Sequence, residues 1–182
     1  MLIVAITGRP GIGKSTIFSK VAEALKAHGY TLYGFYCPEV REGARRIGFR
    51  IVDINTGKAG WLALSIDKVT QLGYNPHGKR IGRYVVIEEE ALQIGINALR
   101  VSTKENSVLG IDEIGPMELS MPKLREEITR SLVEARRALL VVHRNLNDKV
   151  ILDIFRKRNA KVYTVTELNR DSLPNMILRE FI

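Results

Sequence analysis

Hydrophobic residues in this chain occur either in short runs or in stretches where they recur every three or four positions. The short runs have the length of strands and cover residues 2–6, 31–36, 84–86, 107–111, 138–142 and 161–165. The periodic stretches place apolar residues on one helix face: Ile17, Val21 and Leu25; Leu92, Ile96 and Leu99; Leu124, Ile128 and Leu132; Val150, Ile151, Ile154 and Phe155. Because a period near 3.6 predicts an amphipathic helix, strands and helices are expected to alternate along the chain.

This alternation predicts an α/β fold, with a mainly parallel sheet that helices cover on both faces. Connections between parallel strands are expected to be right-handed, and ligands are expected at the carboxyl ends of the strands. A length of 182 residues suits one domain with a single core, so residues 1–182 are expected to form one unit.

Glycine, proline and polar residues mark the interruptions in this pattern. Residues 44–64 predict a β-hairpin, because an alternating segment and an apolar segment flank the turn over residues 55–58. Pro38 and Gly43 predict an exposed turn over residues 37–43. Residues 65–83 are polar and rich in glycine, which predicts a mobile surface loop.

Helix boundaries follow from capping residues and helix breakers. The first helix is expected to end near His28, before Gly29, and a later one is expected over residues 88–103. Pro122 suits the first position of the next helix. Asn147 and Asp171 are the expected N-caps of the last two helices, the second of which is expected to run through Phe181.

The first strand leads directly into a glycine-rich turn of defined spacing. Residues 8–16 match the pattern G-x-x-x-x-G-K-[ST] and read Gly8, Arg9, Pro10, Gly11, Ile12, Gly13, Lys14, Ser15 and Thr16. An ordinary turn with chance glycines would not require the pattern, the preceding strand and the following helix to coincide. In such a loop the backbone N–H groups and the positive end of the helix bind phosphate. We predict that Lys14 reaches the outer phosphates of a nucleoside triphosphate and that Ser15 is a ligand of Mg²⁺.

Two adjacent acids end the buried strand over residues 107–111. In P-loop proteins a carboxylate in this position lies beside the nucleotide magnesium, so Asp112 is the predicted second magnesium ligand. Glu113 would then lie near the γ-phosphate, where it can orient an attacking water. For Glu113 the alternative is an acid in an ordinary solvated turn.

Other candidate site residues follow strand ends. A cation near the γ-phosphate stabilises the charged transition state, and Arg41 and Arg144 are the candidates chosen for this role, although a solvated surface arginine is the alternative for each. Asn169 and Arg170 follow the last strand, in a region that often packs near the nucleotide base in P-loop folds. For Asn169 the alternative is a cap of the last helix.

Five segments, taken in order, resemble a known family. They are the loop from Gly8 to Ser15 and residues 38–49, 82–86, 111–119 and 166–171. Together they resemble the small nucleoside-triphosphatase family first described in hyperthermophiles, which has a human relative called cancer-related nucleoside-triphosphatase. The resemblance spans nearly the whole chain, and the run Asp-Glu-Ile-Gly-Pro-Met-Glu-Leu over residues 112–119 is its most distinctive part.

The resemblance implies a RecA-like strand order and slow, Mg²⁺-dependent hydrolysis of several nucleoside triphosphates: ATP, GTP, CTP and UTP. It also implies that Lys14, Ser15, Asp112 and Glu113 have the roles given above. One departure is Cys37, because a threonine is expected there in relatives and its hydroxyl is lost in this chain.

Composition narrows the remaining alternatives. The formal net charge of +8 attracts polyanions of any kind, so a non-enzymatic nucleotide switch that binds nucleic acid stays an alternative, although no DNA- or RNA-binding signature appears. A nucleotide or small-molecule kinase could use the same loop, but Glu113 favours water as the acceptor. No apolar run approaches about 18 residues, no signal peptide is recognisable, and Cys37 is the single cysteine, so a cytoplasmic protein is expected. A monomer is expected as well.

Overall fold

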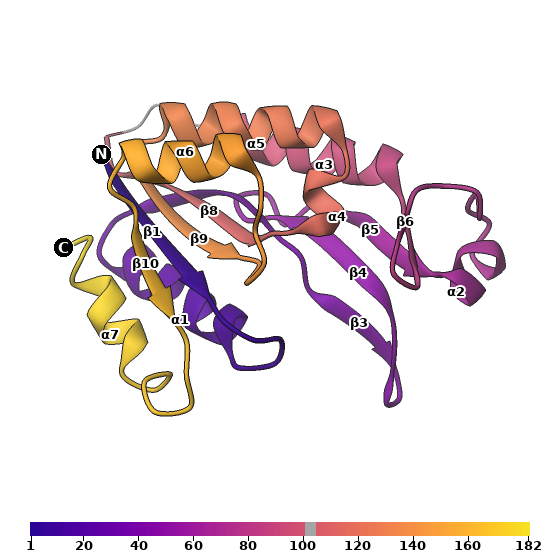
Figure 1. The fold of residues 1–182 in the computed structure, drawn as a ribbon, viewed down its shortest axis with the longest axis horizontal. Coiled ribbons are helices and arrows are strands. Elements are labelled where there is room, and N and C mark those ends of the chain that lie inside the picture. Colours follow the sequence, from indigo (N-terminus) through magenta and orange to yellow (C-terminus); the bar gives the residue numbers. More distant parts are fainter. Residues whose placement is uncertain (101–104) are drawn as a thin grey trace.

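The computed structural model describes residues 1–100 and 105–182. Within these ranges ten strands form one sheet in the order β10-β1-β9-β8-β2-β4-β5-β7-β6, and β3 pairs with β4 (Figure 1). Five of them are parallel to one another: β1 (Leu2–Thr7), β2 (Thr31–Tyr36), β8 (Ser107–Ile114), β9 (Arg137–Val142) and β10 (Lys161–Thr164). Strand β1 lies between β10 and β9, which is the RecA-like order, so the predicted fold class is confirmed.

The other half of the sheet is antiparallel and comprises β3 (Glu39–Glu42), β4 (Arg45–Asp53), β5 (Ala59–Ser65), β6 (Arg80–Ile81) and β7 (Tyr84–Val86). Strands β4 and β5 form the predicted hairpin. The Asp53 carboxylate accepts hydrogen bonds from the backbone N–H groups of Asn55 and Thr56 and so fixes the turn. Strand β4 also pairs with β2, which makes the hairpin a continuation of the main sheet.

Two segments predicted to be irregular contain regular structure. The predicted turn over residues 37–43 is wrong, because β3 pairs there with β4. The predicted loop over residues 65–83 contains helix α2 (Ile66–Gln71) as well as β6. The side chain of Val69 in α2 is fully buried against Leu64, Val85 and Ile87. Burial of the Val69 side chain therefore stabilises a helix within residues 65–83, although the composition of this segment is typical of a loop.

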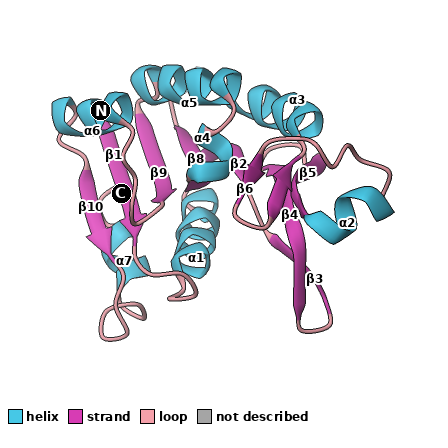
Figure 2. Cartoon of the chain, turned by 45° about the vertical axis from the view of Figure 1, so that its right-hand side comes forward, coloured by secondary structure: helices cyan, strands magenta, loops and turns pink. Residues whose placement is uncertain are grey.

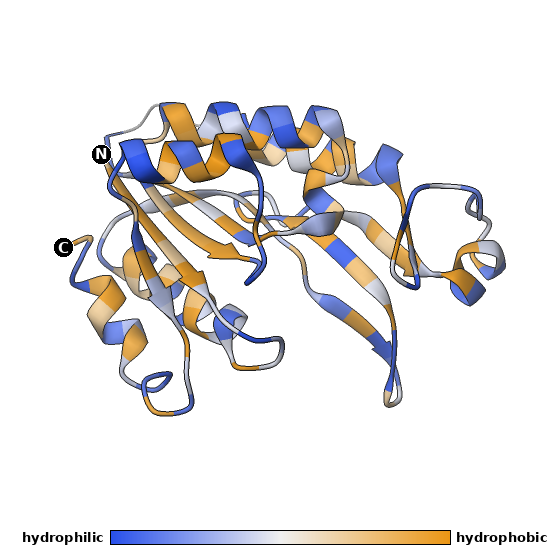
Figure 3. Cartoon of the chain, in the orientation of Figure 1, coloured by the Kyte–Doolittle hydropathy of each residue, from blue (hydrophilic) through white to orange (hydrophobic). Residues whose placement is uncertain are grey.

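Helices cover both faces of the parallel half, as Figures 1 and 2 show from two directions. One face carries α1 (Lys14–Ala27) and α7 (Leu173–Leu178), and the other carries α5 (Pro122–Glu134) and α6 (Lys149–Lys157). Helix α3 (Glu88–Leu99) lies on the same side as α5 and packs on β2, β4 and β5. Buried apolar residues form a separate core cluster on each side of the strands. In Figure 3 the central strands are accordingly hydrophobic along their length, and the helices alternate between hydrophobic and hydrophilic residues. None of the helices in the described ranges is long and apolar enough to cross a membrane.

Several predicted helix details are wrong. Helix α3 ends at Leu99, and residues 101–103 of the prediction lie outside the described residues. Val150 does not face inward but is 44% exposed, because the apolar face of α6 is formed by Ile151, Ile154 and Phe155. The residue before α7 is Ser172 rather than Asp171, and the helix ends at Leu178 rather than at Phe181. A short helix, α4 (Pro116–Leu119), follows β8 and was not predicted.

The N-cap of α6 is Asp148 rather than the predicted Asn147. The Asp148 carboxylate accepts hydrogen bonds from the backbone N–H groups of Val150 and Ile151 at 3.0 and 3.1 Å. It also pairs with both Nε and Nη2 of Arg125 on α5, at 2.5 and 3.1 Å. The hydrogen bond from Arg125 is the main reason why the pKa of Asp148 is lowered. One side chain thus caps a helix and joins it to its neighbour.

We expect Asp148→Ala to lower the free energy of unfolding by about 1–3 kcal/mol, because it removes both the cap and the partner of a guanidinium. Asp148→Asn keeps the capping acceptor and should lose less. Since the pKa is lowered in the folded state, the contribution of the charge is present at neutral pH and is lost as the pH falls through the folded-state pKa. Urea unfolding at pH 7 measures both variants, and an unchanged midpoint in Asp148→Ala would contradict this account.

Candidate active site

The glycine-rich loop connects the end of β1 to the beginning of α1. Gly11 and Gly13 have positive φ angles of 75° and 108°, which L side chains rarely adopt. Gly13 is the N-cap of α1 and has no side chain to satisfy the N–H groups of the first helical turn. These groups are therefore available to bind an anion, as the sequence predicted for a phosphate-binding loop.

Lys14 lies in this loop with only 11% of its side chain exposed. Its ammonium group donates to the carbonyl oxygens of Gly8 and Arg9 at 3.2 and 3.4 Å. The same group lies 3.7 Å from Oε2 of Glu113. The loop cation and the second acid of β8, which are 99 positions apart in the sequence, thus meet at one place.

Asp112 and Ser15, the predicted magnesium ligands, are neighbours at the site. Asp112 is 8% exposed, and burial raises the pKa of its carboxyl group to about 6, with a smaller contribution from the negative charge of Glu113. A hydrogen bond from the Ser15 hydroxyl and the charge of Lys14 act in the opposite direction. Burial penalises the ionised form of such a carboxyl, and a nearby cation favours it.

This donor set fits Mg²⁺, which takes hard oxygen ligands and is commonly held by one or two carboxylates together with substrate phosphates. In the part of the chain that is described, no group of three or more His, Cys, Asp or Glu side chains could hold a metal by itself. A hydroxyl and one buried carboxylate beside a phosphate-binding loop therefore suit a metal that arrives with its nucleotide.

Glu113 is less buried than Asp112, with 27% of its side chain exposed. Both acids belong to β8, whose pairing with β9 shifts register between Asp112 and Ile114. Glu113 is thus accessible to solvent and lies beside Lys14. Its role in orienting a water molecule stays a prediction. The alternative of an ordinary solvated turn is wrong, because Glu113 is part of the strand and contacts the loop lysine.

The two candidate arginines lie in exposed positions. Arg41 is on β3, where its Nε donates to Glu39 at 2.7 Å and its Nη1 donates to the carbonyl oxygen of Ala44 at 2.9 Å. Arg144 is exposed in the turn after β9. A contact of either arginine with the γ-phosphate stays a prediction.

The segment after β10 lies against the phosphate-binding loop. A Cβ atom added to Gly8 would come within 3.1 Å of the carbonyl oxygen of Val165, and Arg9 forms an ion pair with Glu167. Asn169 stabilises the turn there, because its side chain accepts from the N–H of Thr166 at 2.8 Å and donates to the carbonyl oxygen of Thr164 at 3.0 Å.

Asn169 is not the cap of the last helix, which begins at Leu173 after Ser172. The position of this turn beside the loop is compatible with a contact to the nucleotide. For Asn169 and Arg170 that contact stays a prediction.

The sequence predicts no function for Cys37, and it singles out Glu118 as part of the distinctive run and as the nearest alternative to Glu113 for the catalytic role. Both are at the site: the N–H of Cys37 donates to the carbonyl oxygen of Asp112 at 2.6 Å, and Glu118 is only 5% exposed. Burial raises the pKa of the Cys37 thiol, and the negative charges of Glu118 and Asp112 add to this effect. The spacing of Gly115 and Glu118, that of a capping box, could have indicated the role of this glutamate.

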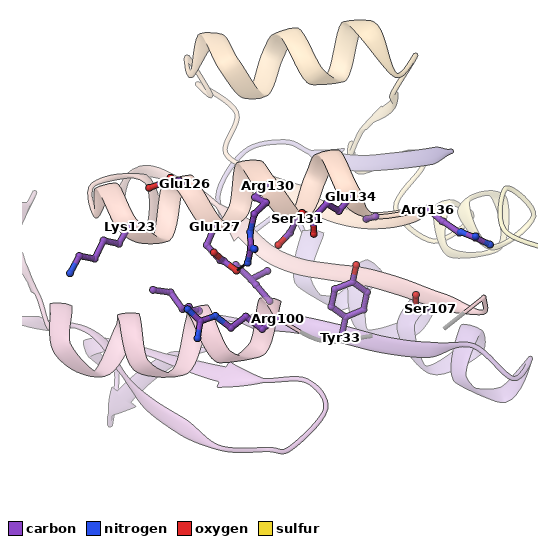
Figure 4. Close-up of a pocket in the computed structure, with 13 residues that line it drawn as sticks. Tyr33, Arg100, Ser107, Lys123, Glu126, Glu127, Arg130, Ser131, Glu134 and Arg136 are labelled. Atoms are coloured by element: carbon purple, nitrogen blue, oxygen red, sulfur yellow. Dashed lines mark hydrogen bonds and ion pairs between the residues drawn. The ribbon is translucent and has the colours of Figure 1, made fainter. Parts of the chain in front are cut away.

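A cavity of about 930 Å³ lies on the other face of the sheet, between α3 and α5. Figure 4 shows Tyr33 rising from β2 toward α5, with Ser131, Glu134 and Arg130 around it. None of the residues 8–16, nor Asp112 or Glu113, lines this cavity. The candidate active site is therefore separate from this cavity, and it is identified by its side chains and by the geometry of the glycine-rich loop.

Comparisons with known proteins agree with this arrangement. A family model described as NTPase matches residues 3–178. The nucleoside-triphosphatase THEP1 of Sulfurisphaera tokodaii is 42% identical over 181 residues, which are 100% of this chain and 95% of that protein. The crystal structure of THEP1 from Aquifex aeolicus superposes with a TM-score of 0.80 at 27% identity and covers 99% of both chains.

The solution structure of a human cancer-related nucleoside triphosphatase is also similar, with a TM-score of 0.75, 32% identity and coverage of 98% of this chain and 96% of that one. The family model spans nearly the entire sequence, and the S. tokodaii relative matches it from end to end. This chain therefore belongs to the THEP1 family of nucleoside-triphosphatases.

Proposed function

We propose that this protein hydrolyses nucleoside 5′-triphosphates to the diphosphate and inorganic phosphate, with Mg²⁺, slow turnover and little preference for the base. The main observation behind the proposal is that Nζ of Lys14 lies 3.7 Å from Oε2 of Glu113, beside the buried carboxyl group of Asp112. Curated relatives that match this chain over nearly its full length bear the name nucleoside-triphosphatase, which supports the same reaction here.

Each residue of the site has a defined task in this reaction. The N–H groups of Gly11, Gly13, Lys14 and Ser15 bind the phosphates, whereas that of Ile12 donates to the carbonyl oxygen of Arg9 at 3.3 Å. Lys14 exchanges its carbonyl partners for phosphate oxygens. Ser15 and Asp112 would hold Mg²⁺, which when bound supplies positive charge to the phosphate oxygens. Glu113 accepts a hydrogen bond from water, orients it toward the γ-phosphorus and takes its proton on a carboxylate oxygen.

Slow turnover is part of the proposal because Arg41, one of the two candidate arginines, is already hydrogen-bonded to other residues. Arg41 bonds to Glu39 and to Ala44, and it would have to leave both partners to reach a phosphate. A cation delivered to the γ-phosphate is worth roughly 10³–10⁵ in turnover in related phosphoryl-transfer systems, so a site without it hydrolyses slowly.

Broad base specificity is expected because the assigned contacts are with phosphates and magnesium, which all nucleoside triphosphates share. ATP, GTP, CTP and UTP should therefore all be hydrolysed. A phosphate-release assay with each of the four, and with no added acceptor, measures this. A preference above about a thousandfold for one base, roughly 4 kcal/mol of discrimination, would contradict the prediction.

The same assay separates hydrolysis from the kinase alternative. A hydrolase releases phosphate with water as the sole acceptor, whereas a kinase requires a second substrate. Formation of nucleoside diphosphate without release of inorganic phosphate, seen only after a nucleoside monophosphate or another small-molecule acceptor is added, would therefore favour the kinase and overturn the proposed function.

A further inference from the structure

One buried carboxyl group at the site has no task in the hydrolysis proposed above. Glu118 lies on α4, the short helix that follows β8, and is 5% exposed. Among the described residues it is the only glutamate that is buried. A buried carboxyl group is costly to desolvate, so its bonding partners indicate what it does.

Glu118 holds the backbone that leaves the catalytic strand. Its Oε2 accepts a hydrogen bond from the N–H of Gly115 at 3.1 Å, in a buried position. The carbonyl oxygen of Gly115 accepts from the N–H of Leu119 at 3.0 Å. Both polar groups of Gly115 are thus fixed by α4, and Gly115 lies two residues after Glu113. The position of Glu113 is therefore tied to α4 through a single short segment.

The carboxyl groups of Glu113 and Glu118 converge on Gly115. A Cβ atom added to Gly115 would lie 3.2 Å from Oε1 of Glu113 and 3.2 Å from Oε2 of Glu118. The two oxygens are consequently no further apart than twice that distance. Gly115 has an extended backbone with φ of −142°, so it is the crowding by the two carboxyl groups that favours glycine here.

The charge state of Glu118 suits this arrangement. Burial raises its pKa to about 8, and the negative charge of Glu113 adds to the effect. Cys37, which also approaches Glu118, contributes a hydrogen bond that acts in the opposite direction. At neutral pH Glu118 is then mostly uncharged, and it can accept the Gly115 hydrogen bond without placing a second negative charge beside Glu113.

We propose that Glu118 is the positioning residue of Glu113: by holding the N–H of Gly115 it fixes the end of β8, so that the Glu113 carboxylate stays beside Lys14 and faces the attacking water. This inference rests on the proposed function. It requires an acceptor at position 118 and does not require a negative charge there.

The test compares Glu118→Met with Glu118→Gln. Methionine keeps the length of the side chain but removes the acceptor, and a misplaced Glu113 should lower kcat by about 10- to 100-fold. Glutamine keeps a neutral acceptor for the Gly115 N–H, and its kcat should stay within about threefold of wild type. Equilibrium binding of a fluorescent magnesium nucleotide should be unchanged in both, because neither touches the phosphate-binding loop.

A double-mutant cycle separates positioning from general stability. In a Glu113→Gln background, Glu118→Met should lower kcat no further, because the carboxylate that it positions is already gone. A matched control is Glu90→Met, since Glu90 also accepts a hydrogen bond from a backbone N–H, the partly buried one of Trp61 at 2.6 Å, but lies on α3. Its kcat should equal that of wild type.

The inference is overturned if Glu118→Met keeps the wild-type kcat, if Glu118→Gln is as impaired as Glu118→Met, or if the effects of positions 113 and 118 multiply. Should Glu118→Met not fold, Gly115→Ala reaches the same segment from the backbone, and a wild-type kcat in that variant overturns the inference equally. Failure of the proposed function looks different, because wild-type protein would then release no phosphate or Glu113→Gln would be fully active.

Discussion

Lys14→Ala will keep its fold but lose nearly all turnover and much of its affinity for magnesium nucleotides. Lys14 is the cation that the phosphate-binding loop itself provides, and its ammonium group already lies over the loop, bonded to Gly8 and Arg9 and close to Glu113. Removing one preorganised charge from a transition state of this kind costs about 10²–10³ in kcat. Single-turnover phosphate release and equilibrium nucleotide binding measure the two effects separately.

Lys20→Ala is the matched control, because Lys20 lies on the same helix α1 but is exposed. It should bind and hydrolyse nucleotide as the wild type does. Urea unfolding should give similar midpoints for both variants, since the Lys14 ammonium group interacts with two loop carbonyl oxygens and with the acids of the site rather than with the hydrophobic core. Wild-type hydrolysis by a folded Lys14→Ala protein would refute the assignment of residues 8–16 as the phosphate-binding loop.

The parts of the site that could be predicted from the sequence are those that depend on local structure. The loop from Gly8 to Thr16 needs one strand before it and one helix after it, and these occupy consecutive residues. Asp112 could be predicted because a buried strand ends in an acid, and parallel strands bring their carboxyl ends to one edge. The hairpin of β4 and β5 followed from a turn and alternation within about twenty residues.

The parts that could not be predicted depend on contacts between distant residues. Strand β3 exists because β4 provides its backbone partners, although Pro38 and Gly43 flank it. Val69 anchors α2 only because strands β5 and β7 lie beneath it. Glu118 acquires its environment from Cys37 and Glu113, which no spacing rule brings together. The same limit applies to Arg41, because it lies on the same side of β3 as its partner Glu39 only once β3 has paired with β4.

The final prediction separates nucleotide binding from chemistry at two adjacent acids. Glu113→Gln should bind magnesium nucleotide almost as wild type does, because Glu113 holds neither the phosphates nor the metal in the proposed mechanism. Glutamine has the same size and still hydrogen-bonds to water, but it cannot take a proton. Single-turnover hydrolysis should therefore fall by about 10²–10⁴, the usual contribution of a positioned acid–base group.

Asp112→Asn should behave in the opposite way. A buried amide is a poorer magnesium ligand than a carboxylate, so the variant should need more Mg²⁺ and bind nucleotide more weakly. Titrating Mg²⁺ against a fluorescent nucleotide for both variants therefore tests the division of labour. A wild-type rate in Glu113→Gln would transfer the catalytic role to another acid, with Glu118 the nearest candidate in the sequence. Normal binding and normal turnover in both variants would show that the assignment of Asp112 and Glu113 to the active site is wrong. These carboxylates contact Ser15 and Lys14, so a nucleotide bound at the loop should depend on them for binding or for hydrolysis.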